Sequence, residues 1–175
     1  ISMLQRLKSS DSPHDQDVFA CMIHSLLDEY RFFPEYPVDA LATTSVLFGS
    51  TIFFELIDGA ALTIALRYIL ESARQPSDSK IFKFAIQALY SFLKRLPEWP
   101  KYCTMLSEIP SLQNQPQIYE MVKSVVNGTA PPPVTANSAV GKDKSSSPSQ
   151  QQHQTSAGSA SSPGDNKSSS TDISN

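Results

Sequence analysis

The chain contains little cysteine, glycine and histidine: of 175 residues, 2 are Cys, 6 are Gly and 3 are His. Two cysteines cannot build a disulfide framework, and the spacing of Cys21 and Cys103 is not that of metal ligands, so we expect both to be buried thiols. No apolar run is long enough to cross a membrane. The amino terminus also lacks the basic and apolar regions of a secretory signal.

Signals for β-strands are equally scarce. Only Gly49 and Gly59 precede residue 127, apolar and polar residues do not alternate over any long stretch, and no Asn-Gly or Asp-Gly pair joins two β-branched runs. Apolar residues recur instead at spacings of three and four, which is the period of an amphipathic helix. The sequence therefore predicts an all-α fold.

Seven segments show this helical period, and prolines separate most of them. The expected helices cover residues 1–8, 13–30, 38–54, 59–73, a fifth segment that ends at residue 96, 99–106 and 118–125, and either Ser77 or Ser79 can start the fifth. The first has no capping residue, so we expect it to be the end of a longer helix. Helix pairs recur about every 40 residues, which is the period of HEAT-type repeats. We therefore expect a HEAT-like α-solenoid of antiparallel helix pairs rather than a closed bundle.

The composition changes after residue 127. From Gly128 to Asn175 the chain has no aromatic residue and is rich in Ser, Pro and Gln. Such a segment cannot bury enough apolar surface to offset the entropy lost on ordering. We expect a helical domain over residues 1–127 and a disordered linker over residues 128–175.

Patterns typical of catalytic sites are missing. There is no Gly-rich phosphate loop, no His-Glu-x-x-His and no nucleophile elbow. Asp28 and Glu29 are paired carboxylates, but adjacent residues on a helix point to different sides. His24 lies off the main apolar face of its helix and is best explained as a partly exposed residue. We expect no enzymatic activity, no metal site and no cofactor.

Basic residues between positions 67 and 101 raise one alternative function. They are Arg67, Arg74, Lys80, Lys83, Lys94, Arg95 and Lys101. Acidic residues are interleaved with them and the formal net charge is -3, whereas a nucleic-acid surface needs a clustered excess of Lys and Arg. A mixed, solvated surface is the simpler interpretation. The alternative is an RNA-binding helical domain with a basic face.

The most unusual segment is residues 29–37, Glu-Tyr-Arg-Phe-Phe-Pro-Glu-Tyr-Pro, where four aromatic residues lie between two expected helices. They either seal the corner between helix pairs or line an apolar groove for an amphipathic helix of a partner. For the groove, the candidate residues follow a spacing of three or lie beside the apolar faces of their helices. They are Leu27, Tyr30, Phe33, Tyr68 and Phe82.

Five motifs in register resemble one known family. They are residues 29–37, Leu47-Phe48-Gly49-Ser50, residues 65–71, residues 76–80 and Trp99-Pro100-Lys101-Tyr102-Cys103. Over residues 3–126 their order and spacing resemble the large scaffold subunit of the eukaryotic CCR–NOT mRNA deadenylase complex. The matching part is its HEAT-repeat domain, which in animals binds the C-terminal helix of tristetraprolin.

The resemblance implies a non-catalytic docking platform. Its partners would be helical motifs of RNA-binding regulatory proteins, with other CCR–NOT subunits held by the rest of the scaffold and no direct contact with nucleic acid or membrane. Recruited nucleases would then shorten poly(A) tails, leading to mRNA decay and translational repression. The implied location is the cytoplasm, including P-bodies, and also the nucleus. The resemblance leaves open which regulator docks here.

Overall fold

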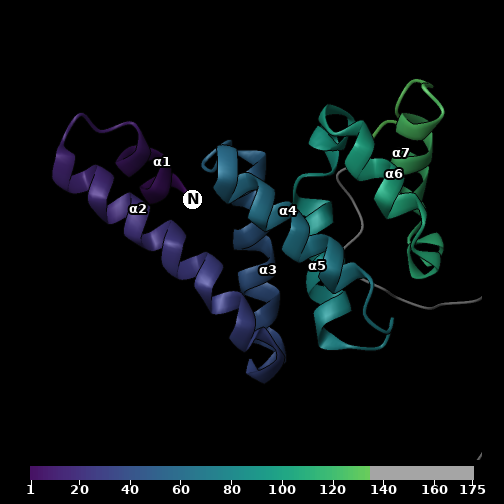
Figure 1. Cartoon of the computed structure of the whole chain (residues 1–175), viewed down its shortest axis with the longest axis horizontal. Helices are drawn as coiled ribbons and strands as arrows, with labels where there is room; N and C mark the ends of the chain where they lie inside the picture. Colours follow the sequence, from purple (N-terminus) through teal and green to yellow (C-terminus); the bar gives the residue numbers. More distant parts are fainter. Residues whose placement is uncertain (135–175) are drawn as a thin grey trace, which may run out of the picture. The chain divides into compact units, whose positions relative to one another are not determined.

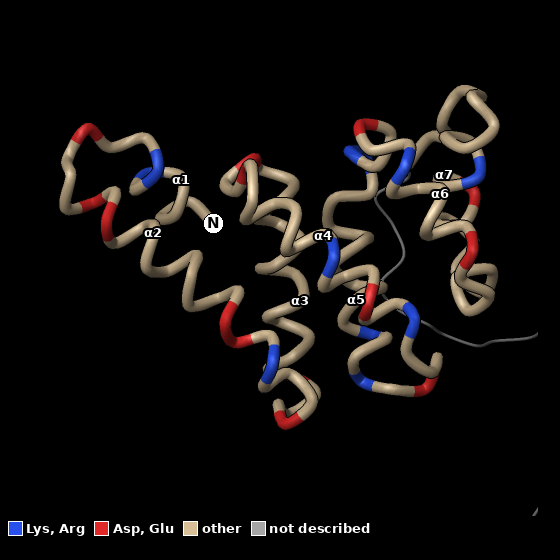
Figure 2. Tube along the Cα trace, viewed as in Figure 1, with Lys and Arg blue, Asp and Glu red and all other residues tan. Residues whose placement is uncertain are grey.

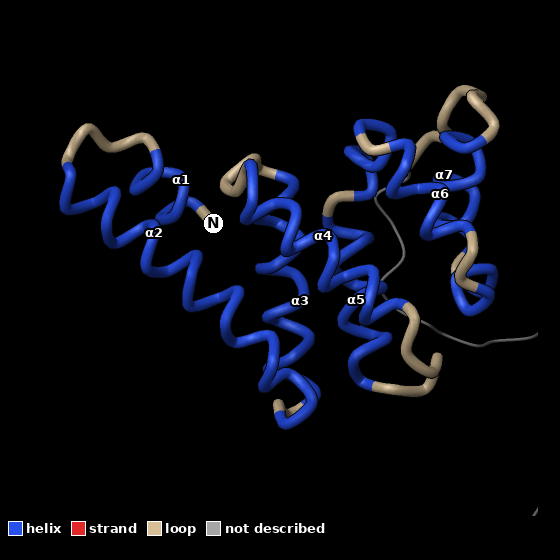
Figure 3. Tube along the Cα trace, in the orientation of Figure 1, coloured by secondary structure: helices blue, strands red, loops and turns tan. Residues whose placement is uncertain are grey.

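A computed structural model describes residues 1–134 of the chain. Within that range the structure contains seven α-helices and three 3₁₀ helices, and no strand (Figures 1 and 3). The predicted all-α fold is confirmed. Residues 135–175, which hold most of the predicted linker, lie outside the described residues.

The helices follow the predicted order with small shifts of their ends. The α-helices are α1 Ser2–Lys8, α2 Pro13–Asp28, α3 Val38–Phe53, α4 Gly59–Ala73, α5 Lys80–Ser91, α6 Pro100–Ser107 and α7 Pro116–Val126. The 3₁₀ helices are η1 Glu29–Glu35, η2 Leu93–Glu98 and η3 Pro110–Asn114.

One predicted helix is too long. We expected the fifth helix to continue to residue 96, but α5 ends at Ser91 and the chain continues as η2. Pro97 explains the difference, because its ring would clash with the carbonyl of Leu93 in an α-helix and it has no N–H to donate. The segment before the proline therefore adopts the tighter 3₁₀ form, as η1 does around Pro34.

The helices pack as successive pairs that stack on their neighbours. Within pairs, α1 contacts α2, α4 contacts α5 and α6 contacts α7. Between pairs, α3 packs along α5, while α4 contacts both α2 and α6. The main contacts thus join helices that are close in chain order, which is the arrangement expected of an α-solenoid (Figure 1).

Buried phenylalanines fill the corner where α2 leads into α3. Phe33, Phe48 and Phe84 are almost completely buried. The ring of Phe84 lies edge-to-face with both others, with centroid distances of 4.9 Å to Phe33 and 5.4 Å to Phe48. Such pairs add to the stabilisation from area burial alone. These contacts join η1, α3 and α5, so part of the aromatic segment does seal the corner.

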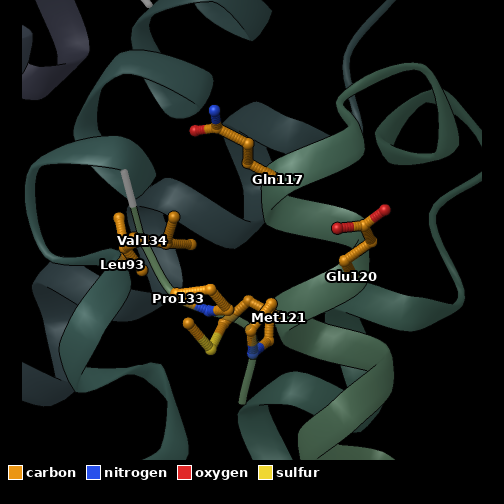
Figure 4. A pocket seen from close by; sticks show the side chains of 7 residues that line it. Leu93, Gln117, Glu120, Met121, Pro133 and Val134 are labelled. Carbon is orange, nitrogen blue, oxygen red and sulfur yellow. The ribbon is translucent and has the colours of Figure 1, made fainter. Parts of the chain in front are cut away.

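The end of α7 directs the following residues back onto the folded unit. Gly128 has φ 67°, Gly128 N donates to Val125 O (3.2 Å) and Thr129 N donates to Ser124 O (2.8 Å), which together form a Schellman motif. Beyond this turn, Val134 packs against the hydrophobic core. Figure 4 shows Pro133 near Met121 and Val134 near Leu93, around a small cavity of about 30 Å³.

Candidate docking surface on α2 and α4

A pair of stacked tyrosines joins the end of α2 to α4. The rings of Tyr30, at the start of η1, and Tyr68, on α4, are nearly parallel, with an interplanar angle of 7° and a centroid distance of 4.0 Å. Both side chains are half-buried. They therefore contribute to packing and also keep part of their aromatic surface accessible to solvent.

Hydrogen bonds hold the first of these rings in place. The hydroxyl of Tyr30 donates to the carbonyl oxygen of Tyr68 at 3.3 Å and lies 2.9 Å from Oγ of the buried Ser72. Burial raises the pKa of the Tyr30 hydroxyl, so the group remains a protonated donor at physiological pH. Sequence patterns did not identify Ser72, because a serine in the interior of a helix carries no distinctive signal.

The neighbouring helix α2 is incompletely buried. Ile23 is its single buried residue, Phe19 and Leu27 are half-buried, and the side chain of Met22 is 38% exposed. The predicted apolar face of this helix is thus only partly covered within the described residues. Uncovered apolar side chains at helical spacing are typical of a surface that receives another helix.

The charge on α2 has one sign. The helix carries Asp15, Asp17 and Asp28 and no Lys or Arg (Figure 2). Near Tyr68, the exposed Arg67 lies over the ring at 5.8 Å and its Nε is 3.7 Å from Glu71 Oε1. Ion pairs as exposed as this one stabilise a protein little. The Lys, Arg, Asp and Glu side chains of α2 itself are therefore all acidic, whereas a basic residue, Arg67, lies beside Tyr68 on α4.

The structure separates the five predicted groove residues into two groups. Leu27, Tyr30 and Tyr68 are half-buried and retain accessible surface, whereas Phe33 is 0% and Phe82 is 3% exposed. The expectation that Phe82 is partly exposed is wrong, because α5 packs against α3, α4 and η1 at once and buries more than one stripe of side chains. Phe33 and Phe82 are core residues in this structure.

Comparison with known proteins assigns the family. A family model described as "CCR4-NOT transcription complex subunit 1 TTP binding domain" matches residues 1–133. The chain belongs to this family. The predicted resemblance to the CCR–NOT scaffold subunit is confirmed.

Relatives with similar sequences are far longer proteins. The chain is 50% identical over 123 residues to General negative regulator of transcription subunit 1 of Saccharomyces cerevisiae, covering 70% of this chain and 6% of that protein. It is 47% identical over 142 residues to the protein of the same name in Schizosaccharomyces pombe, and the match covers 81% of this chain and 6% of that protein. The chain thus spans a small fraction of these relatives.

A solved structure supports the same fold. The chain is similar to the N-terminal domain of the yeast Not1, with a TM-score of 0.67 and 48% sequence identity over 74% of this chain and 24% of the solved one. This identity is high enough for the helices of the two proteins to be compared pair by pair.

Of the basic residues in this TTP-binding domain, Arg95 has a structural role. Its guanidinium forms two hydrogen bonds with Glu98 (2.6 and 2.8 Å), donates to the carbonyl of Ile52 and lies 5.2 Å from the Trp99 ring centroid. The hydrogen bonds to Glu98 raise the pKa of Arg95, and the same contact lowers the pKa of Glu98. The guanidinium therefore already donates to groups within the protein and is not available to bind a phosphate.

The two cysteines of the domain differ in exposure. Cys103 is buried, its thiol donates to the Leu96 carbonyl at 3.3 Å, and burial raises its pKa to about 11. Cys21 is exposed on α2, so the prediction that both thiols are buried is wrong for this residue. The incomplete packing of α2 explains the difference.

Residues 1–134 contain neither a candidate metal site nor a candidate membrane-spanning helix. No group of three or more His, Cys, Asp and Glu side chains in that range is placed to hold a metal ion. None of the helices described there is long and apolar enough to cross a membrane.

Proposed function

We propose that this chain is a non-catalytic docking module of the CCR–NOT deadenylase complex. Membership of the TTP-binding family supports this role, as does similarity to subunit 1 proteins of two yeasts. In this role the module binds regulators that are themselves attached to an mRNA. Nucleases held elsewhere in the complex then shorten the poly(A) tail, which promotes decay and represses translation.

The α2–α4 surface is the proposed binding site. The observation that carries this assignment is the half-buried Tyr30–Tyr68 stack beside the incompletely packed side of α2. A partner helix would place apolar residues at i, i+3, i+4 and i+7 against this surface. Tyr30 and Tyr68 suit the role of anchors, because aromatic rings bury large areas with few rotatable bonds. Leu27 completes the site one turn before Tyr30.

The charge of α2 defines the kind of helix. Three aspartates without a basic residue favour a partner that carries Arg or Lys beside its apolar face. The proposed ligand is therefore a short, basic, amphipathic helix, of the kind that an RNA-binding regulator can carry in a terminal segment. We place this interaction in the cytoplasm, including P-bodies, and in the nucleus, where mRNA-bound regulators occur.

RNA binding through a basic face is the competing function, and salt distinguishes the two. The test measures fluorescence anisotropy of labelled tristetraprolin C-terminal peptide and of labelled poly(A) RNA with the full chain at increasing salt. We expect the peptide to bind with an affinity that falls only modestly as salt increases, because apolar contacts dominate at the α2–α4 surface. RNA affinity dominated by phosphate contacts would fall steeply through counterion release. Tight, salt-sensitive RNA binding without peptide binding would refute the docking function.

A further inference from the structure

A second groove lies between α3 and α5, apart from the tyrosine stack. Its volume is about 130 Å³. Leu41, Ala42 and Ser45 line it from α3, and Phe84 lines it from α5. Further along the same two helices, Gly49 brings α3 into close contact with Ala88, so the groove is confined to the first turns of both helices. An apolar cavity of about 150 Å³ holds a benzene molecule, so this one suits a single large side chain.

The floor of this groove is apolar and its polar groups are already paired. Leu41 and Phe84 are buried, and the hydroxyl of Ser45 donates to the Leu41 carbonyl at 2.6 Å. At the mouth, the apolar side chain of Val38 is 61% exposed. The groove therefore has room for an apolar side chain and no unsatisfied buried hydroxyl to attract water.

The rim of the groove is positive. Lys80 and Lys83 line it, no Asp or Glu does, and none of the ion pairs found among residues 1–134 involves either lysine. Lys80 Nζ donates to the Tyr36 carbonyl at 2.9 Å, which places the start of α5 next to the start of α3. Two helix amino termini, each with a partial positive charge, thus lie at the same end of the groove. Figure 2 shows the basic residues at the beginning of α5.

We propose that the α3–α5 groove binds an acidic peptide segment that inserts one large apolar side chain between the helices. The apolar floor accepts the side chain, while Lys80, Lys83 and the two helix termini attract the carboxylates on either side of it. The charge preference is opposite to that of the α2–α4 surface. One module can therefore hold two different partners at once, and this site does not depend on the proposed function of the other.

The test uses the full chain labelled with ¹⁵N and a short synthetic peptide with a central Leu flanked by Glu on both sides. We expect amide resonances of residues 38–45 and 80–87 to shift on titration. A peptide with Lys in place of Glu, and one with Ser in place of Leu, should not bind. Added salt should weaken the interaction, because the carboxylates contribute through exposed charges.

Substitutions in the chain test which residues of the α3–α5 groove contact the acidic peptide. Lys83→Gln should weaken binding about tenfold, which corresponds to about 1.4 kcal/mol. Ala42→Phe, which fills the groove, should abolish it, and Lys94→Gln, on an exposed lysine outside the groove, should leave it unchanged. Equal binding of the acidic and basic peptides, or shifts confined to α2 and α4, would overturn the proposal. So would a stable dimer of the chain that occupies the groove.

Discussion

A Cβ atom on Gly49 would lie 2.4 Å from the carbonyl oxygen of Ala88 and 2.6 Å from Cβ of Ser91. The backbones of α3 and α5 approach this closely only because residue 49 has no side chain. The Ala88 carbonyl belongs to the backbone of a packed helix, so it cannot move aside cheaply.

Replacing this glycine should therefore destabilise the fold. Alanine is the better helix former by about 1 kcal/mol, but the clash should outweigh that gain. We expect Gly49→Ala to lower the free energy of unfolding by about 1–3 kcal/mol, the usual cost of overpacking. Urea denaturation of the full chain measures it, with Ser50→Ala as the control that should be nearly neutral. A Gly49→Ala variant as stable as the wild type would mean that α3 and α5 lie further apart than described.

Phe82 and Tyr68 should respond differently to truncation. Phe82→Ala removes a buried ring and should cost about 3–5 kcal/mol of stability, as large-to-small changes in cores do. Tyr68→Ala removes a half-buried ring and should weaken binding of the helical partner peptide by about 1–3 kcal/mol, with helix content nearly unchanged. Thermal unfolding and peptide anisotropy on both variants separate the two roles. Normal peptide binding by Tyr68→Ala would remove that residue from the site.

Arg95 should matter for stability and for its dependence on pH. Arg95→Gln loses the bonds to Glu98 and Ile52 and the contact with Trp99, and should cost about 1–3 kcal/mol. The lowered pKa of Glu98 adds stability above the pKa of an unfolded Glu, about 4.3, and this part is lost as pH falls through the folded pKa.

The side chain of Glu98 is largely exposed, so solvent screens its interaction with Arg95. We therefore expect the pH-dependent contribution of Glu98 to the free energy of unfolding to be about 0.5 kcal/mol. Denaturation experiments between pH 3 and pH 7 measure this contribution. As pH falls, the free energy of unfolding should decrease slightly more steeply for the wild type than for Arg95→Gln. Identical stability of the two proteins throughout this range would contradict the assigned role, and Lys94→Gln serves as the neighbouring control.

The folded unit should extend beyond the boundary predicted from composition. We propose that it includes residues 128–134, because the Schellman turn at Gly128 returns the chain to the core and Val134 packs there. Removal of residues 135–175 should leave the thermal midpoint unchanged. Removal of residues 128–175 should lower stability by about 1–2 kcal/mol through lost apolar burial. If the two truncated chains are equally stable, the folded unit ends at residue 127, as the composition predicts.

The sequence predicted the helices well because the signals for them are local. Apolar spacing and proline positions depend on neighbouring residues, so the all-α fold followed from them directly. The exposure of Phe82 and Cys21 depends instead on how many helices surround each position. Periodicity assigns every helix one buried face, whereas α5 packs extensively against its neighbours and α2 buries only Ile23. Such differences arise from tertiary packing and have no signal within a single segment.

The candidate site was predictable only in part for the same reason. The aromatic segment at residues 29–37 indicated a special corner, but not which rings close it and which remain accessible. That division is set by the stack of Tyr30 on Tyr68, which are far apart in the chain, and by the buried Ser72 that holds the Tyr30 hydroxyl. The α3–α5 groove had no sequence signal, because it depends on the close approach of two helices at Gly49.

The most direct test of the central claim is an NMR titration of the ¹⁵N-labelled full chain with the tristetraprolin C-terminal peptide. We predict that amide resonances of α2, η1 and α4 around Leu27, Tyr30 and Tyr68 shift. We also predict that the Tyr68→Ala variant requires about tenfold more peptide, equivalent to about 1.4 kcal/mol. No binding at all, or shifts restricted to α6 and α7, would contradict the assignment of the α2–α4 surface as the docking site.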